Sequence, residues 1–77
     1  MKYHVSYYYE DGTHDLLLNR SYNSDIEAFR GELYKTLDNN QNPQKRNISY
    51  FVLYRYVPQV LDWKHLVTQH FNGNQIR

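Results

Sequence analysis

The histidines are the residues of this chain best suited to bind a metal ion, but their spacing argues against a shared site. His4 and His14 belong to two predicted strands of one hairpin and point to opposite faces of it. His65 and His70 are five residues apart in a segment for which we favour a helix, which is poor ligand geometry. Since the chain also has no cysteine, we expect neither a metal site nor a bound cofactor.

The sequence also offers few residues for acid–base or nucleophilic catalysis. Glu10 and Asp15 fall on an exposed hairpin, and the other carboxylates are typical of helix caps or solvated positions. Gly12, Gly31 and Gly73 are too scattered to form a phosphate-binding loop. A chain of 77 residues is also too short for a deep pocket. We therefore expect a protein that is not an enzyme.

The elements that carry these residues begin with a predicted β-hairpin. Residues 2–10 are rich in β-forming side chains, Asp11-Gly12 suits a two-residue type I′ turn, and residues 13–20 complete the second strand. This turn predicts the pairs Glu10–Thr13, Tyr9–His14, Tyr8–Asp15, Tyr7–Leu16, Ser6–Leu17 and Val5–Leu18. The better core face of this hairpin consists of Tyr3, Val5, Tyr7, Tyr9, Leu16 and Leu18.

One amphipathic helix is predicted for residues 25–38. Ser24 can cap its first turn, and Glu27 follows at the spacing of a capping box. The apolar stripe consists of Ile26, Phe29, Leu33 and Leu37, with Glu27, Glu32, Lys35 and Asp38 mostly outside it. Gly31, in the middle, either permits close packing or is tolerated at about 1 kcal/mol relative to alanine.

For the second half of the chain we predict a loop, then a strand, then a segment whose pattern fits either a strand or a helix. Residues 39–47 are rich in amides and predict a mobile loop, whereas residues 48–57 are typical of a strand buried on both faces. Residues 61–71 fit a strand by the alternation of Leu61, Trp63, His65, Val67 and Phe71. They fit a helix by the spacing of Trp63, Leu66, Val67, His70 and Phe71, and we favour the helix. Residues 73–77 are expected to be a loose C-terminus.

Together the elements predict one small α+β domain that covers residues 1–77. Their order is ββαβα, or a final strand replaces the second helix. A right-handed crossover places the third strand beside the first and antiparallel to it, which gives a three-stranded sheet in the order 2-1-3. We expect the helix to cover one face through Val5, Tyr7, Leu16, Leu18, Tyr50, Val52 and Tyr54.

Composition narrows the classes of partner. Nine Lys and Arg against eight Asp and Glu leave a formal charge of +1, so neither a strong basic nor a strong acidic field names a partner. The lack of cysteine is compatible with a reducing compartment. Neither a signal peptide nor a long apolar segment is present, and we expect a cytoplasmic protein that does not bind membranes.

Tyrosine content points to protein binding. Nine tyrosines and one tryptophan exceed what so small a domain can bury, and tyrosine is enriched at interaction surfaces. We expect a non-enzymatic module that binds a host protein stoichiometrically and occludes it, or that associates with itself as a homodimer. The candidate partner-binding residues are Tyr8, Tyr9, Tyr22, Tyr34, Lys45, Arg46, Arg55 and Tyr56.

The alternative function is that of a nucleic-acid-binding accessory or regulatory protein. It requires an open sheet face that offers stacking surfaces beside the cations of the central loop. The residues that would supply it are Lys2, His4, Tyr8, Phe51 and Arg55, with Lys45 and Arg46. We favour a second face that is instead covered by a terminal helix.

In its overall make-up the chain resembles the short stand-alone proteins that bacteriophages and mobile elements encode. The resemblance covers the whole chain, including the turn Glu10–Thr13 and the helix cap Ser24–Glu27, which also occur in unrelated folds. Many proteins of this class are single α+β domains that inhibit or redirect a host protein, including defence proteins. The resemblance therefore implies an inhibitor with anti-defence activity.

Overall fold

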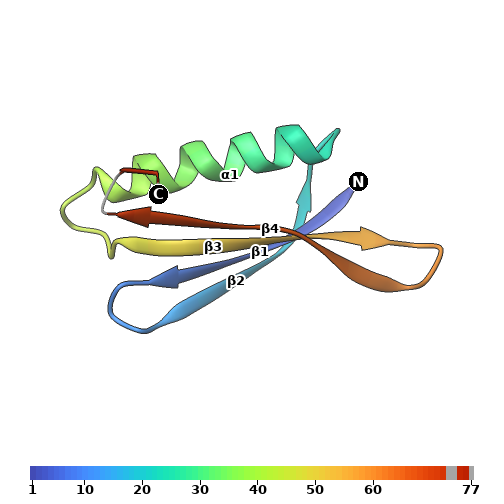
Figure 1. Cartoon of the computed structure of the whole chain (residues 1–77), viewed down its shortest axis with the longest axis horizontal. Coiled ribbons are helices and arrows are strands. Elements are labelled where there is room, and N and C mark those ends of the chain that lie inside the picture. The colour runs from blue at the N-terminus through green and yellow to red at the C-terminus, as the bar shows by residue number, and fades with distance from the viewer. Residues whose placement is uncertain (73–74, 77) are drawn as a thin grey trace.

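A computed structural model describes residues 1–72 and 75–76 of the chain. Its elements are β1 (Lys2–Tyr9), β2 (His14–Ser21), α1 (Asp25–Asn40), β3 (Ile48–Val57), β4 (Asp62–Asn72) and β5 (Gln75–Ile76). The strands form one antiparallel sheet in the order β2-β1-β3-β4-β5. Helix α1 lies along one face of this sheet (Figure 1), and the described residues contain no second helix to cover the other face.

The α+β class and the order of the first three strands are confirmed, but the structure of residues 61–71 differs from the helix that we favoured. Strands 2, 1 and 3 are neighbours, and β3 is antiparallel to β1, as predicted. The helix favoured for residues 61–71 is wrong, because this segment forms β4 and extends the sheet beside β3. The strand alternative is confirmed, so the sheet has more than the three strands expected.

The first hairpin turns through three residues rather than two. The amide of Tyr9 donates to the Thr13 carbonyl at 2.9 Å, and the Gly12 amide donates to the Tyr9 carbonyl at 3.1 Å. Gly12 has a φ of 88°, a left-handed conformation that glycine adopts without strain. The extra loop residue makes Tyr8 pair with His14, so the predicted pairing of Tyr9 with His14 is wrong by one residue.

This shift of β2 relative to β1 matters, because a change of one residue in the pairing register moves every side chain of a strand to the other face of the sheet. Leu17 packs against the core beneath α1, whereas Leu16 and Leu18 are each 53% exposed. Their predicted place in the core is therefore wrong. His4 and His14 were expected on opposite faces, and they lie on the same one.

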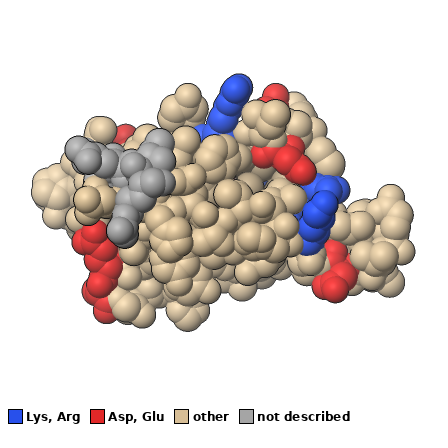
Figure 2. Space-filling model, in the orientation of Figure 1, with Lys and Arg blue, Asp and Glu red and all other residues tan. Residues whose placement is uncertain are grey.

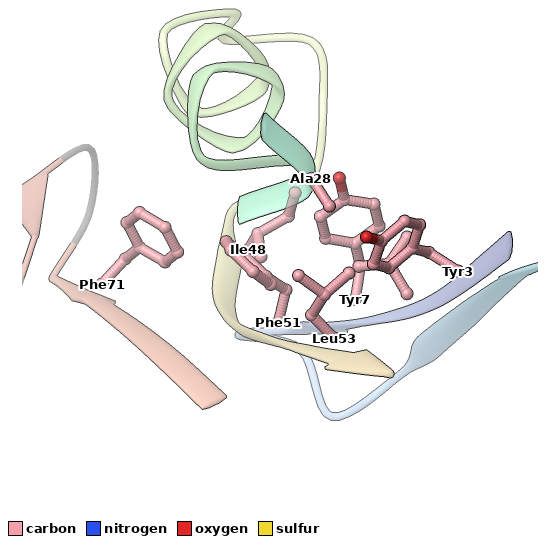
Figure 3. Packing of buried hydrophobic residues seen from close by; sticks show 8 residues of the cluster. Tyr3, Tyr7, Ala28, Ile48, Phe51, Leu53 and Phe71 are labelled. Carbon is pink, nitrogen blue, oxygen red and sulfur yellow. The ribbon is translucent and has the colours of Figure 1, made fainter. Parts of the chain in front are cut away.

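The core lies between α1 and the face of the sheet that carries the odd-numbered residues of β1 and β3 (Figure 3). Its members are Tyr3, Val5, Tyr7, Ala28, Ile48, Phe51, Leu53 and Phe71. The predicted inward direction of Tyr3, Val5 and Tyr7 is confirmed. The predicted helix contacts of Tyr50, Val52 and Tyr54 are wrong. Phe51 pairs with Tyr7 and Leu53 with Val5, which turns those three residues away from α1.

Helix α1 begins as predicted and ends slightly later. The Ser24 hydroxyl oxygen accepts a hydrogen bond from the Glu27 amide at 3.2 Å, which confirms the cap. At the other end, the Asn40 side chain accepts from the Ile48 amide at 2.8 Å and donates to the Ile48 carbonyl at 3.2 Å. The mobility of residues 39–47 stays a prediction. The predicted loose C-terminus at 73–77 lies outside the described residues except for β5.

The buried face of α1 contains a carboxylate. Ala28, Glu32 and Thr36 are fully buried, whereas Ile26, expected in the apolar stripe, is 63% exposed. The hydroxyls of Tyr7 and Tyr22 both donate to Glu32, and the Lys35 amino group lies 3.6 Å from it. These bonds satisfy the carboxylate inside the protein, so the placement of Glu32 outside the buried stripe is wrong.

Candidate binding face

The face of the sheet away from α1 gathers aromatic side chains from four strands. It carries the even-numbered residues of β1, His14 and Leu16 of β2, and the even-numbered residues 50–56 of β3. Strand β4 presents residues of both parities because Leu66 is left unpaired in a bulge. Leu53 pairs with Val67 but Tyr54 pairs with His65, so the bulge brings His65 and His70 to the same face. We name this surface the aromatic face; it consists of His4, Tyr8, His14, Tyr50, Tyr54, Tyr56, Trp63, His65 and His70.

One row of rings crosses the sheet from β2 to β4. Tyr8 stacks on Tyr50 with ring centroids 4.5 Å apart and planes inclined by 13°. His14 stacks on Tyr8 at 5.4 Å, and His70 approaches Tyr50 at 4.9 Å with a tilt of 35°. The four residues occupy paired positions on adjacent strands, where cross-strand side chains stand closest together. The row is therefore a direct product of the register.

A second group of rings lies nearer the β3–β4 turn. His4 stacks on Trp63 with centroids 3.3 Å apart, and Tyr56 lies 5.1 Å from Trp63. Tyr54 meets His65 edge to face at 5.8 Å. Burial beneath its neighbours lowers the pKa of His4 below the ordinary histidine value, because a cation is disfavoured there. This imidazole is accordingly neutral at neutral pH.

The aromatic face is accessible and almost free of formal charge. His14, His65 and His70 are exposed, the other rings are half-buried, and the exposed Leu16 and Leu18 extend the face along β2. Among the strand residues that the structure describes, Lys2 is the one Lys, Arg, Asp or Glu that the alternation places here. On the side of the molecule seen in Figure 2, uncharged residues cover most of the surface and the charged residues are scattered.

The structure separates the predicted partner-binding residues into several places. Tyr8 and Tyr56 belong to the aromatic face. Tyr9 and Arg46 lie together on the helix side, where the guanidinium carbon is 4.0 Å from the ring centroid and the Tyr9 hydroxyl donates to Asp15 at 2.8 Å. Lys45 is exposed in the loop that also carries Arg46. These five positions therefore do not form one patch.

The remaining candidates, Tyr22, Tyr34 and Arg55, lie on the side of the molecule that carries α1. Tyr22 donates its hydroxyl to buried Glu32, which gives that ring a structural role. Tyr34 is 67% exposed on the outer surface of α1. Arg55 is half-buried, with its Nε 3.1 Å from the Asp25 carboxylate, so it does not reach the aromatic face.

The residues that the sequence reasoning missed are Tyr50, Tyr54, Trp63, His65, His70 and His14. The alternation of residues 50, 52, 54 and 56 was recognised, but that side of β3 was assigned to the helix. Trp63, His65 and His70 lie in the segment for which a helix was favoured. Phe51, placed on the open face in the nucleic-acid alternative, is fully buried beneath α1. The open second face that this alternative required is nevertheless present, because no terminal helix covers it within the described residues.

Other kinds of site are not evident in the described part of the chain. Residues 1–72 and 75–76 contain no group of three or more His, Cys, Asp or Glu arranged to hold a metal ion. The helix found among them lacks the length and apolar character needed to span a membrane. Comparisons with protein-family models, with curated proteins and with solved structures found no match.

Proposed function

We propose that this protein is a non-enzymatic protein-binding module that uses the aromatic face to cover a surface of its partner. The observation that carries the proposal is an accessible layer of stacked tyrosine, tryptophan and histidine rings with no covering element among the described residues. Tyrosine and tryptophan supply large contact areas with little loss of side-chain entropy, and they dominate binding hot spots. Uncovered aromatic surface of this extent is typical of an interaction site.

A protein partner suits this face better than a nucleic acid does. Base stacking requires ring faces that are free, but Tyr8 lies between His14 and Tyr50, and His4 lies against Trp63. Phosphate binding requires several cations, and the strands contribute only Lys2 to this side of the described sheet. Neutral ring edges and hydroxyls instead match the polar and aromatic surface of a protein.

In this proposal the module acts stoichiometrically, by occlusion rather than by chemistry. A rigid sheet face that covers a functional surface needs no catalytic group. This mode of action is that of the small inhibitors that bacteriophages and mobile elements direct against host proteins, including defence proteins. A chain without cysteine suits action in the cytoplasm.

The test is affinity capture from a bacterial lysate with matched variants. Tyr50→Ser removes a ring from the middle of the aromatic face, and Tyr34→Ser removes an exposed ring from the outer surface of α1. We expect the wild-type chain and Tyr34→Ser to retain the same protein and Tyr50→Ser, with unchanged circular dichroism, to lose it. Retention by all three, or recovery of nuclease-sensitive nucleic acid without protein, would contradict the proposal.

A further inference from the structure

We propose that the aromatic face also binds a second copy of the chain, so that two sheets pack face to face in a symmetric homodimer. This inference rests on the proposed binding role of the same face and names one partner for it. In a two-fold dimer the same patch is used on both copies, so the patch must be complementary to itself. Three properties of the face meet that requirement.

The first property is hydrogen-bonding chemistry. Tyrosine hydroxyls donate and accept, and a neutral imidazole has one donor and one acceptor nitrogen. Both groups of rings contain tyrosines and histidines, so each copy offers hydroxyls and imidazoles with which the other copy can form hydrogen bonds. His14 on β2 and His70 on β4 are exposed and accessible to such contacts. His65 is also exposed, but its Nε2 already lies 2.9 Å from the Thr68 hydroxyl.

The second property is the lack of charge repulsion. Lys2 is the charged strand residue on this side of the described sheet, and it lies at the first position of β1, away from the middle. The whole chain carries a formal charge of only +1. Two copies therefore approach through this face without a strong field to keep them apart.

The third property is area. Four strands spaced about 4.8 Å apart, each about eight residues long at about 3.3 Å per residue, present roughly 500 Å² of flat surface. Side chains that stand on the sheet increase the accessible area above the flat value. This approaches the roughly 600 Å² per partner at which specific interfaces begin. Face-to-face packing of two sheets about 10 Å apart is also an ordinary arrangement of β structure.

Thr68 provides a sharp test, because it is exposed on β4 between the two groups of rings. Thr68→Lys introduces a charge there that would face the second copy, and Gln41→Lys introduces the same charge at the exposed end of α1. By sedimentation equilibrium at about pH 8, we expect wild type and Gln41→Lys to dimerise. We expect Thr68→Lys to remain monomeric at concentrations at least about tenfold higher.

Two results would overturn the inference. The first is a wild-type chain that stays monomeric at millimolar concentration. The second is a dimer that both lysine variants preserve equally. If Thr68→Lys fails to fold, isotope-filtered nuclear Overhauser spectra of mixed labelled and unlabelled wild type decide the question, since the dimer requires contacts between rings of different copies. A monomer that still captures a protein in a Tyr50-dependent way removes self-association alone and leaves the proposed function standing.

Discussion

Tyr8 and Tyr50 stack nearly parallel across the β1–β3 pair, on the side of the sheet opposite α1, with centroids 4.5 Å apart. Their neighbours along each strand point the other way: Tyr7 pairs with Phe51 inside the core. The same two strands thus build a packed interior with one set of residues and an accessible aromatic layer with the next. The functional proposal depends on this division between the two faces.

Two leucines test the division directly. Leu53 is fully buried beneath α1 and Leu16 is 53% exposed on the aromatic face. Leu53→Ala is expected to lower the free energy of unfolding by about 2–5 kcal/mol, because it leaves a cavity. Leu16→Ala is expected to lower it by less than about 1 kcal/mol. Urea denaturation of both variants measures the difference, and equal losses would show that the register is wrong.

A second prediction concerns Gly31. A Cβ at this position would lie 2.8 Å from Cε1 of Tyr22, whose hydroxyl is held by Glu32. Gly31→Ala is therefore expected to destabilise the protein by about 1–3 kcal/mol. In a Tyr22→Ala background the same change is expected to stabilise it by roughly 1 kcal/mol, the helix propensity of alanine over glycine. Additive effects in this double-mutant cycle would rule out the contact.

Alkaline pH is expected to unfold the protein. Burial, with hydrogen bonds to Asp25 and Glu32 respectively, raises the pKa of Tyr3 and of Tyr22 to about 12, and burial also raises the pKa of Tyr7. A raised pKa stabilises the fold below the unfolded value of about 10, and this contribution is lost as pH rises through about 12. Unfolding free energies should fall over this range. Tyr22→Phe should weaken the dependence, and an equally steep fall in this variant would contradict the role given to Tyr22.

Mild acid is expected to destabilise the fold through His4. Burial lowers the pKa of this imidazole, so the unfolded chain binds a proton at a higher pH than the folded chain does. Stability is thus retained above about pH 6.5 and lost as pH falls through the lowered pKa of His4. Thermal melts between about pH 7 and pH 5 measure this slope. The same slope in His4→Gln would assign it to other groups.

Local signals predicted much of the fold. The Ser24 cap, the Asp11-Gly12 turn region and the continuous β-forming residues of 48–57 each specify structure through neighbours in sequence. The order 2-1-3 followed from the handedness of the crossover. These features depend on short-range chemistry, so a single sequence was sufficient to predict them.

The candidate site depended on two irregularities that single residues decide. One extra residue in the first hairpin loop shifted β2, and the bulge at Leu66 interrupted the alternation of β4. The bulge places the consecutive residues Leu66 and Val67 against the core, a pattern that a regular strand does not give. The accessible side of β3 depends on its long-range pairing with β1, in which Tyr8 lies opposite Tyr50 and Tyr7 opposite Phe51. No local signal specified that register, so most of the aromatic face was missed.

Site-specific photocrosslinking tests the central claim most directly. Benzoylphenylalanine is placed at exposed His70 on the aromatic face, and in a separate chain at exposed Tyr34 on α1. After irradiation in a bacterial lysate, we expect discrete protein adducts from position 70 that position 34 does not give. Adducts from position 34 alone, or none from position 70 while the chain still captures its partner, would contradict a binding role for the aromatic face.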